Sequence, residues 1–240
     1  MTNKFIVIFR ALGNFPNDEL EVLLKKNNYK VITFPILKIV NLRTAPINTV
    51  NIQAILVTSS NGLYNLSKLS NNRKIKLFTV GSTSKKIAKE LGFKNVIDCN
   101  GDSVKMFEVV VNNTIADGGY LLYVGAKDIS VNLPKMLEGV GYRVKRHVVY
   151  RTVELEMLDR KFLSLIKSKQ VGWIVLLSKK GALNFNRLIH KNSSLNYLKN
   201  VKFACLSSNI AEALSNKFYS KFFPQKPSLN DIKHVILKNE

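Results

Sequence analysis

The sequence predicts an α/β protein of two similar lobes, each with a parallel sheet covered by helices. Short apolar runs alternate with helical patterns along the 240 residues, which is typical of parallel strands joined by right-handed crossovers. The chain also repeats itself, because a strand–turn–helix–strand pattern over Phe5–Ile39 returns over Tyr120–Val153. A repeat of this length indicates two related lobes rather than a solenoid, and a cleft between two lobes is where we expect a ligand.

The predicted strands are near-continuous apolar runs, and this pattern is typical of strands buried on both faces. Four of them belong to a second repeat, in which Ile55–Gly62 is similar to Ile174–Gly181 and Leu77–Ser84 is similar to Phe203–Ile210. The predicted strand cores are Phe5–Phe9, Ile55–Val57, Leu77–Val80, Leu121–Val124, Ile174–Leu177 and Phe203–Leu206.

Helical patterns follow most of these runs after a small or polar turn. In the segment that begins at Leu63, for example, Leu63, Leu66 and Leu69 share one face. The predicted helices are Asp18–Lys26, Leu63–Leu69, Ser84–Leu91, Leu133–Gly139 and Ile210–Leu214.

The lobes are expected to join where the first repeat ends in both copies, near Pro35 and near Tyr150. The middle of the sequence would then form one lobe and the two ends together the other. We predict a discontinuous lobe of residues 1–35 and 154–240, an inserted lobe of residues 41–147, and hinge strands at 36–40 and 148–153. Two extended crossings would form a hinge that lets the cleft close on its ligand.

The formal net charge of +21 is high for a protein with ordinary fractions of hydrophobic (46%) and charged (22%) residues. The lysines are spread along the chain, without a basic tail or a nucleic-acid-binding motif. Three interpretations stay open, in order of preference: a solvated lysine-rich surface, a cleft that attracts a small polyanion, and a nucleic-acid surface. No apolar run reaches the ~18 residues of a membrane span and no signal peptide is evident, so we expect no membrane association and a cytoplasmic location. The two cysteines, Cys99 and Cys205, suit buried thiols in a reducing compartment.

Small and polar residues follow several strands at the edge where open α/β sheets bind ligands. Ser59 and Ser60 after one strand correspond to Ser178 after another, and their hydroxyls with nearby backbone N–H groups suit capture of a carboxylate or phosphate. Helix capping explains the same serines equally well. Further turns of this kind contain Gly81 with Ser84, Gly125, Ser208 with Asn209, and Arg10.

The motifs of several enzyme classes are absent from the sequence. The three histidines are far apart without metal-ligand spacing, the phosphate-loop Gly-Lys-Ser/Thr is missing, and neither a dinucleotide fingerprint nor a Gly-x-Ser-x-Gly elbow occurs. We therefore expect chemistry that uses no metal, no nucleotide and no strong nucleophile.

The order and spacing of these motifs resemble the uroporphyrinogen-III synthase family over nearly the whole chain. The stretch from Leu121 to Thr152 carries the best match, with Gly125, Asp128 and Tyr150 at its turns and end. Other matching segments are Ile8–Arg10, Phe34–Ile39, Leu56–Gly62, Val80–Gly81 ahead of Ser84, and Leu177–Gly181.

The resemblance implies two flavodoxin-like lobes joined by a two-stranded ladder, and conversion of hydroxymethylbilane into uroporphyrinogen III in the interlobe cleft. The last pyrrole ring is inverted and water is lost, without a metal or organic cofactor. The substrate is a linear tetrapyrrole with eight carboxylates, and we expect a monomer that binds neither nucleic acid nor membrane. The resemblance marks Tyr150 as the residue that assists departure of the hydroxyl. The predicted substrate-binding residues are Arg10, Ser59, Ser60, Gly81, Ser84, Gly125, Ser178, Ser208 and Asn209.

One departure from the family pattern lies at Ser207–Ile210, where family members usually carry glycine and threonine. Two other classes of protein remain as alternatives. A non-catalytic two-lobed protein that binds a small polyanion would have a similar cleft but would not need Tyr150. A nucleic-acid-binding protein would show steeply salt-dependent affinity.

Overall fold

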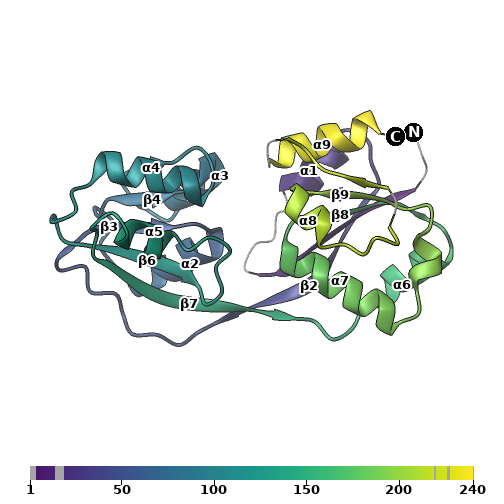
Figure 1. Ribbon diagram of the computed structural model, residues 1–240, viewed down its shortest axis with the longest axis horizontal. Helices are drawn as coiled ribbons and strands as arrows, with labels where there is room; N and C mark the ends of the chain where they lie inside the picture. Colours follow the sequence, from purple (N-terminus) through teal and green to yellow (C-terminus); the bar gives the residue numbers. More distant parts are fainter. Residues whose placement is uncertain (1–3, 14–18, 219, 226–227, 240) are drawn as a thin grey trace. The chain divides into compact units, whose positions relative to one another are not determined.

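The chain divides into two compact units in the computed structural model, which describes residues 4–13, 19–218, 220–225 and 228–239 (Figure 1). Unit 1 comprises Met1–Ile39 and Val153–Glu240, and unit 2 comprises Val40–Thr152. Strands β2 and β7 carry the chain between the units, because the division falls inside both of them. Each unit has a parallel sheet with helices, which confirms the predicted fold class.

Unit 1 is assembled from the two ends of the chain. Its strands are β1 (Phe5–Leu12), β2 (Val31–Asn41), β8 (Val171–Leu176), β9 (Lys202–Cys205) and β10 (Lys221–Phe222). Its helices are α1 (Glu19–Lys25), α6 (Arg160–Lys167), α7 (Lys179–Lys191), α8 (Ser208–Glu212) and α9 (Leu229–Lys238), with a 3₁₀ turn at Leu195–Leu198. The strands lie in the order β2-β1-β8-β9-β10 with parallel pairing, which is the flavodoxin-like order 2-1-3-4-5.

Unit 2 is one continuous segment. Its strands are β3 (Ile52–Val57), β4 (Leu77–Thr79), β5 (Val96–Asp98), β6 (Tyr120–Ala126) and β7 (Val144–Glu154). Its helices are α2 (Ser60–Leu69), α3 (Gly81–Glu90), α4 (Ser103–Asn113) and α5 (Leu133–Glu138). The spatial order β7-β6-β3-β4-β5 is also parallel throughout. It is the order of unit 1 after a circular permutation, since β6 and β7 take the places of β1 and β2.

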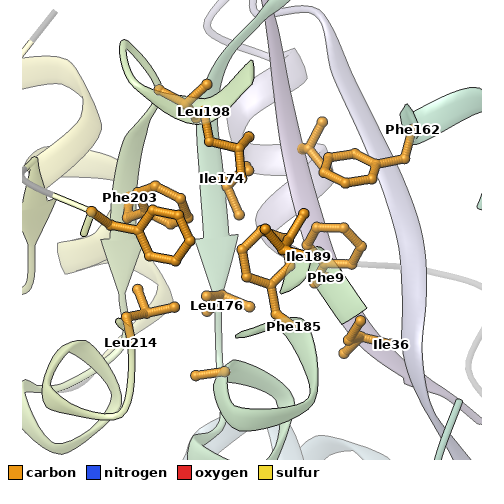
Figure 2. Close-up of a cluster of buried hydrophobic side chains, with 14 of the residues drawn as sticks. Phe9, Ile36, Phe162, Ile174, Leu176, Phe185, Ile189, Leu198, Phe203 and Leu214 are labelled. Atoms are coloured by element: carbon orange, nitrogen blue, oxygen red, sulfur yellow. The ribbon is translucent and has the colours of Figure 1, made fainter. Parts of the chain in front are cut away.

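Aromatic packing fills one face of the sheet in unit 1. Phe9 of β1 lies with its ring centroid 4.9 Å from that of Phe162 of α6 and 5.2 Å from that of Phe185 of α7 (Figure 2). Phe203 of β9 extends this cluster, 5.9 Å from Phe185. Helices α1 and α9 bury apolar residues against the opposite face, so the sheet is covered on both sides.

Unit 2 has the same layers around a smaller core. On one face, Met106 of α4 and Leu137 of α5 pack against Leu56, Phe78 and Leu121 of the sheet. Helices α2 and α3 contact each other and lie outside this cluster. The apolar runs of β3 and β6 are therefore continuous because each strand is buried on both faces.

All six predicted strand cores form strands of the structure, and β4, β8 and β9 each end one residue before the predicted run does. The predicted helices also form, with shifted ends, and Asp18 of the first lies outside the described residues. Helix α3 begins at Gly81 rather than at Ser84, because Gly81 adopts a φ of +76° that turns the chain directly out of β4. Helix α8 likewise begins at Ser208, two residues before the predicted start. Helix α7 was expected after Ser178 but without bounds, and helices α4, α6 and α9 were not predicted.

Both cysteines are buried and unpaired, as expected. Burial raises the pKa of the Cys99 and Cys205 thiols to about 12, so neither is a thiolate at neutral pH. Within the described residues, no helix is both long and apolar enough to cross a membrane.

Candidate functional site

The strongest site geometry lies within unit 2, where the chain leaves β3 and β6. These neighbouring parallel strands lead to helices on different faces of the sheet, since α5 packs in the α4 layer and α2 does not. Ligands of open α/β sheets bind at such switch points, outside the carboxyl ends of the strands. A cavity of about 180 Å³ is found there. It is lined by Thr58, Ser59, Ser103, Tyr123, Ala126, Asp128, Ile129, Ser130, Val131 and Tyr150.

Ser59 connects the start of α2 to this cavity. It is the N-cap of the helix, with extended backbone angles (φ −150°, ψ 150°), and its Oγ accepts a hydrogen bond from the Gly62 N–H at 3.1 Å. Gly62 permits a close approach, because a Cβ there would lie 2.7 Å from Val57 Cγ1 and 3.1 Å from the Val124 carbonyl oxygen. The capping interpretation of Ser59 is therefore confirmed, and the same hydroxyl also lines the cavity.

The Ser59 Oγ lies 2.9 Å from the Tyr150 phenol oxygen, and either group can donate this hydrogen bond. Tyr150 lies on β7 opposite Ala126 and is only 7% exposed. Burial raises the pKa of the Tyr150 phenol above its usual range, and the Ser59 hydrogen bond offsets part of this effect. The phenol is therefore protonated at neutral pH, and Tyr150 is one of the residues that line the cavity.

A second hydroxyl pair lies beside the first. Thr58 Oγ1 is 2.8 Å from the Tyr123 hydroxyl, which joins the end of β3 to the middle of β6. Gly125 keeps space for this ring, because a Cβ at Gly125 would lie 2.9 Å from Tyr123 Cε1. Gly125 was predicted to bind substrate, which stays a prediction. The structure shows that Gly125 packs closely against the Tyr123 ring.

The equivalent position in unit 1 has the same local design. Ser178 is the N-cap of α7, and its Oγ accepts the Gly181 N–H at 3.1 Å. Asn184, three residues further, is 1% exposed and donates to the carbonyl oxygens of Ile36 (2.8 Å) and Leu155 (3.0 Å). The buried amide thus fixes α7 to the chain segments on both sides of the insertion.

The spacing between the capping serine and this asparagine is repeated in unit 2. Asn65 of α2 is six residues after Ser59, as Asn184 is six residues after Ser178. Its side-chain N–H group donates to Asn41 Oδ1 at 3.0 Å. In both units, therefore, one helix has a serine as its N-cap and, six residues later, an asparagine whose side chain donates a hydrogen bond to β2, the strand that leads from one unit to the other.

The remaining predicted site residues occupy strand ends that do not line this cavity. In unit 2, Ser60 and Gly81 are the first residues of α2 and α3, and Ser84 is buried within α3. In unit 1, Arg10 lies near the end of β1. Ser208 and Asn209 are the first residues of α8, and two residues separate this helix from the end of β9. Since β1, β8 and β9 are parallel neighbours, Arg10, Ser178, Ser208 and Asn209 share one edge of the unit 1 sheet.

Sequence reasoning missed four of the six hydroxyl-bearing residues that line the unit 2 cavity. Thr58 directly precedes Ser59 and could have been found from its place at the end of a strand. Tyr123 was hidden inside an apolar run, and only the β3–β6 pairing places it beside Thr58. Ser103 and Ser130 lie in segments that carried no strand-end signal.

Comparison with known proteins identifies the family. A sequence profile described as uroporphyrinogen-III synthase HemD matches residues 18–232, which is most of the chain. The chain belongs to the uroporphyrinogen-III synthase family.

Solved structures of uroporphyrinogen-III synthases share its fold. The Helicobacter pylori 26695 enzyme is 18% identical with a TM-score of 0.65, and the match covers 99% of this chain and 100% of that one. A mutant synthase from the extremely thermophilic bacterium Thermus thermophilus is 16% identical with a TM-score of 0.52, covering 98% and 100% of the two chains. No curated protein sequence gives a significant match.

For a member of the uroporphyrinogen-III synthase family, the unit 2 cavity offers hydrogen bonding rather than a nucleophile. The described residues that line it provide hydroxyl groups on Thr58, Ser59, Ser103, Tyr123, Ser130 and Tyr150. Hydroxyls both donate and accept hydrogen bonds, so these side chains can bind polar groups of either kind. The buried, protonated phenol of Tyr150 is the group best suited to donate a proton there.

Proposed function

We propose that this protein is a uroporphyrinogen-III synthase, a lyase that cyclises hydroxymethylbilane with inversion of the last pyrrole ring and loss of water. Family membership over residues 18–232 is the observation that carries the proposal. The hydroxyl-lined cavity at the β3–β6 switch point supports it, because this is where the fold is expected to bind a ligand. The net charge of +21 supports a substrate with many carboxylates. We further propose that the protein acts as a cytoplasmic monomer.

In the proposed mechanism Tyr150 donates its proton to the departing hydroxyl. Ser59 Oγ already accepts the Gly62 N–H, so its own O–H group is free to point at the Tyr150 oxygen. In that arrangement the phenol proton is directed at a ligand in the cavity. The raised pKa of Tyr150 keeps this proton in place until a stronger acceptor develops.

The electron-rich pyrrole drives the bond cleavage, so the protein's larger task is orientation. Holding reacting ends in one geometry is worth about 7–11 kcal/mol in favourable cases. The other predicted binding residues, Arg10, Ser178, Ser208 and Asn209 in unit 1 and Ser60, Gly81 and Ser84 in unit 2, are proposed to hold carboxylates through hydroxyl, amide and guanidinium donors. The hydroxyl of Ser84 is buried, so its proposed contact requires movement of α3.

An isomer assay tests the function. Purified protein is mixed with freshly generated hydroxymethylbilane, and the products are oxidised and separated as type I and type III porphyrins. Dominant type III product, without added metal or nucleotide, is expected. Only type I product from a folded sample, which is the result of unassisted closure, would favour the non-catalytic binding protein.

The role of Tyr150 is tested by Tyr150→Phe with Tyr142→Phe as a matched control. Both tyrosines are buried in unit 2 to the same 7% exposure, but Tyr142 donates to the Thr114 carbonyl oxygen and does not line the cavity. We expect Tyr150→Phe to lower kcat by about 10- to 100-fold, since general acid catalysis is commonly worth about 10²–10⁴-fold and this leaving group departs easily. Tyr142→Phe should keep the wild-type kcat. Equal kcat values for Tyr150→Phe and wild type would remove the phenol from the mechanism.

A further inference from the structure

We infer that Tyr123 is a further catalytic residue, whose phenol donates a hydrogen bond to the same departing oxygen as Tyr150. The inference rests on the proposed function and deepens it, since it gives the unit 2 cavity two donors for the leaving group. Neither the sequence motifs nor the resemblance assigns Tyr123 a role.

The ring of Tyr123 is directed along its strand toward the carboxyl edge of the sheet. Tyr123 pairs in register with Leu56 of β3, but its hydroxyl lies 2.8 Å from Oγ1 of Thr58, two residues further along β3 and its continuation. Gly125 makes this direction possible, because a Cβ there would lie 2.9 Å from Tyr123 Cε1 and 3.4 Å from its hydroxyl oxygen. Ligands of open α/β sheets bind at that edge, so the phenol is brought to the place where a ligand is expected.

Two phenols are held at the cavity in the same way. Thr58 and Ser59 are consecutive residues, and their side-chain oxygens lie 2.8 Å and 2.9 Å from the phenol oxygens of Tyr123 and Tyr150, respectively. All four residues line the cavity of about 180 Å³. Burial raises the pKa of the Tyr150 phenol, and Tyr123 raises it further by electrostatic repulsion, so the two phenols are close enough to interact. A single bound group can therefore contact both.

The partner of Tyr123 is a hydroxyl group, and this distinguishes it from a tyrosine with a purely structural hydrogen bond. Tyr142, which is also buried, donates to the Thr114 carbonyl oxygen at 3.0 Å. A carbonyl oxygen only accepts, so the Tyr142 proton is committed to it, whereas the Thr58 hydroxyl can donate as well as accept. When Thr58 donates to the Tyr123 oxygen, the phenol proton is available to a ligand. This is the arrangement already proposed for Tyr150.

The two phenols act in one step, whose atoms and electrons balance. The bond between the methylene carbon and the hydroxyl oxygen breaks with its electron pair on oxygen, and the Tyr150 proton joins that oxygen to give water. The pyrrole nitrogen supplies electrons to the methylene carbon, and the Tyr150 phenolate regains a proton when the attacking ring loses one. Tyr123 keeps its proton and donates a hydrogen bond to the oxygen as negative charge develops on it. This bond strengthens in the transition state, so Tyr123 acts on kcat.

The test compares Tyr123→Phe with Tyr142→Phe and with Thr58→Val. Tyr142→Phe removes a buried phenol oxygen of unit 2 from outside the cavity, and Thr58→Val removes the partner hydroxyl but keeps the Tyr123 phenol. Loss of one preorganised donor commonly costs about 10²–10³-fold in kcat, and this leaving group departs easily. We therefore expect Tyr123→Phe to lower kcat about tenfold with little change in KM. Thr58→Val should lower kcat less, and Tyr142→Phe should match wild type.

A double variant separates a direct donor from a residue that only positions Tyr150. Tyr123→Phe combined with Tyr150→Phe should have a lower kcat than Tyr150→Phe alone, because the Tyr123 phenol still contributes its own hydrogen bond when the other phenol is absent. Equal kcat values for the double variant and for Tyr150→Phe would overturn the inference, since Tyr123 would then act only through Tyr150.

Two other outcomes would also overturn the inference. A wild-type kcat in Tyr123→Phe would show that this phenol does not reach the leaving oxygen. Equal losses of kcat in Tyr123→Phe and Thr58→Val, with equally lowered thermal midpoints, would show that the hydroxyl pair has a structural role. In both cases the wild-type protein still forms type III product and the proposed function stands. Wild-type protein that forms only type I product would overturn the proposed function and this inference together.

Discussion

Gly62 and Gly181 occupy equivalent places in the repeat, yet the structure predicts different costs for replacing them with alanine. A Cβ at Gly62 would lie 2.7 Å from Val57 Cγ1 and 3.1 Å from the Val124 carbonyl oxygen, and neither strand atom can move away easily. A Cβ at Gly181 would meet Ser178 Oγ at 2.9 Å, while its next neighbour, Ile36 Cγ2, lies at 3.4 Å. A side-chain hydroxyl can rotate, so the second site is more tolerant.

The magnitudes follow from these contacts. Overpacking against fixed core atoms costs about 1–3 kcal/mol, and alanine recovers up to about 1 kcal/mol of helix propensity. We expect Gly62→Ala to lower the free energy of unfolding of unit 2 by about 2 kcal/mol, because the added Cβ would lie closer to Val57 and Val124 than van der Waals contact allows. In Gly181→Ala, loss of the Ser178 cap costs about 1 kcal/mol and is offset by the gain in propensity, so the net change is near zero.

Urea unfolding with two probes separates the units. Trp173, the single tryptophan of the chain, is buried in β8, so its fluorescence reports on unit 1. Far-ultraviolet circular dichroism reports on both units. With a urea dependence of about 2 kcal/mol per molar, Gly62→Ala should move the unit 2 part of the circular dichroism transition down by about 1 M.

The two variants should leave the Trp173 transition unchanged. A loss of stability in Gly181→Ala as large as that in Gly62→Ala would refute the reasoning from these contacts. So would a shift of the Trp173 transition by Gly62→Ala.

Two further predictions concern buried polar groups. Asn184→Ala should lower the free energy of unfolding of unit 1 by about 2 kcal/mol, because the buried amide loses its hydrogen bonds to the Ile36 and Leu155 carbonyl oxygens. Trp173 fluorescence should detect this loss, and an equal loss in the exposed Asn192→Ala would contradict the prediction. Burial lowers the pKa of His147, so the unfolded chain binds a proton first and the free energy of unfolding should fall as the pH drops below about 6.5. Urea midpoints from pH 7.5 to 5.5 should show this fall in wild type and a smaller one in His147→Asn.

The six strand cores were predictable because each is an apolar run, buried on both faces as Ile55–Val57 and Ile174–Leu176 illustrate, whereas β5 and β10 are short and only partly buried. Helices α6 and α9 escaped prediction because their buried residues are few and flanked by lysines. The helix start at Gly81 depends on a positive φ, and a sequence alone does not say which glycine adopts one.

The site was predictable only where a residue followed a strand. Ser59 and Tyr150 were identified in this way or by resemblance, and the structure places them 2.9 Å apart. Thr58 and Tyr123 meet through the parallel pairing of β3 with β6, which joins segments more than 60 residues apart. Asp128 also lines this cavity, which the sequence pattern did not show.

The circular permutation that relates the two units also sets the order in which a ribosome supplies their strands. Unit 2 is contiguous, so all its strands have been made once synthesis passes Glu154. Strand β1 is made first but pairs with β8, which is finished only at Leu176. At about 5–20 residues per second, the apolar β1 waits roughly ten to thirty seconds for that neighbour. Unit 1 therefore folds after unit 2 and around a strand made before it, and β1 is the strand most in need of protection from aggregation during synthesis.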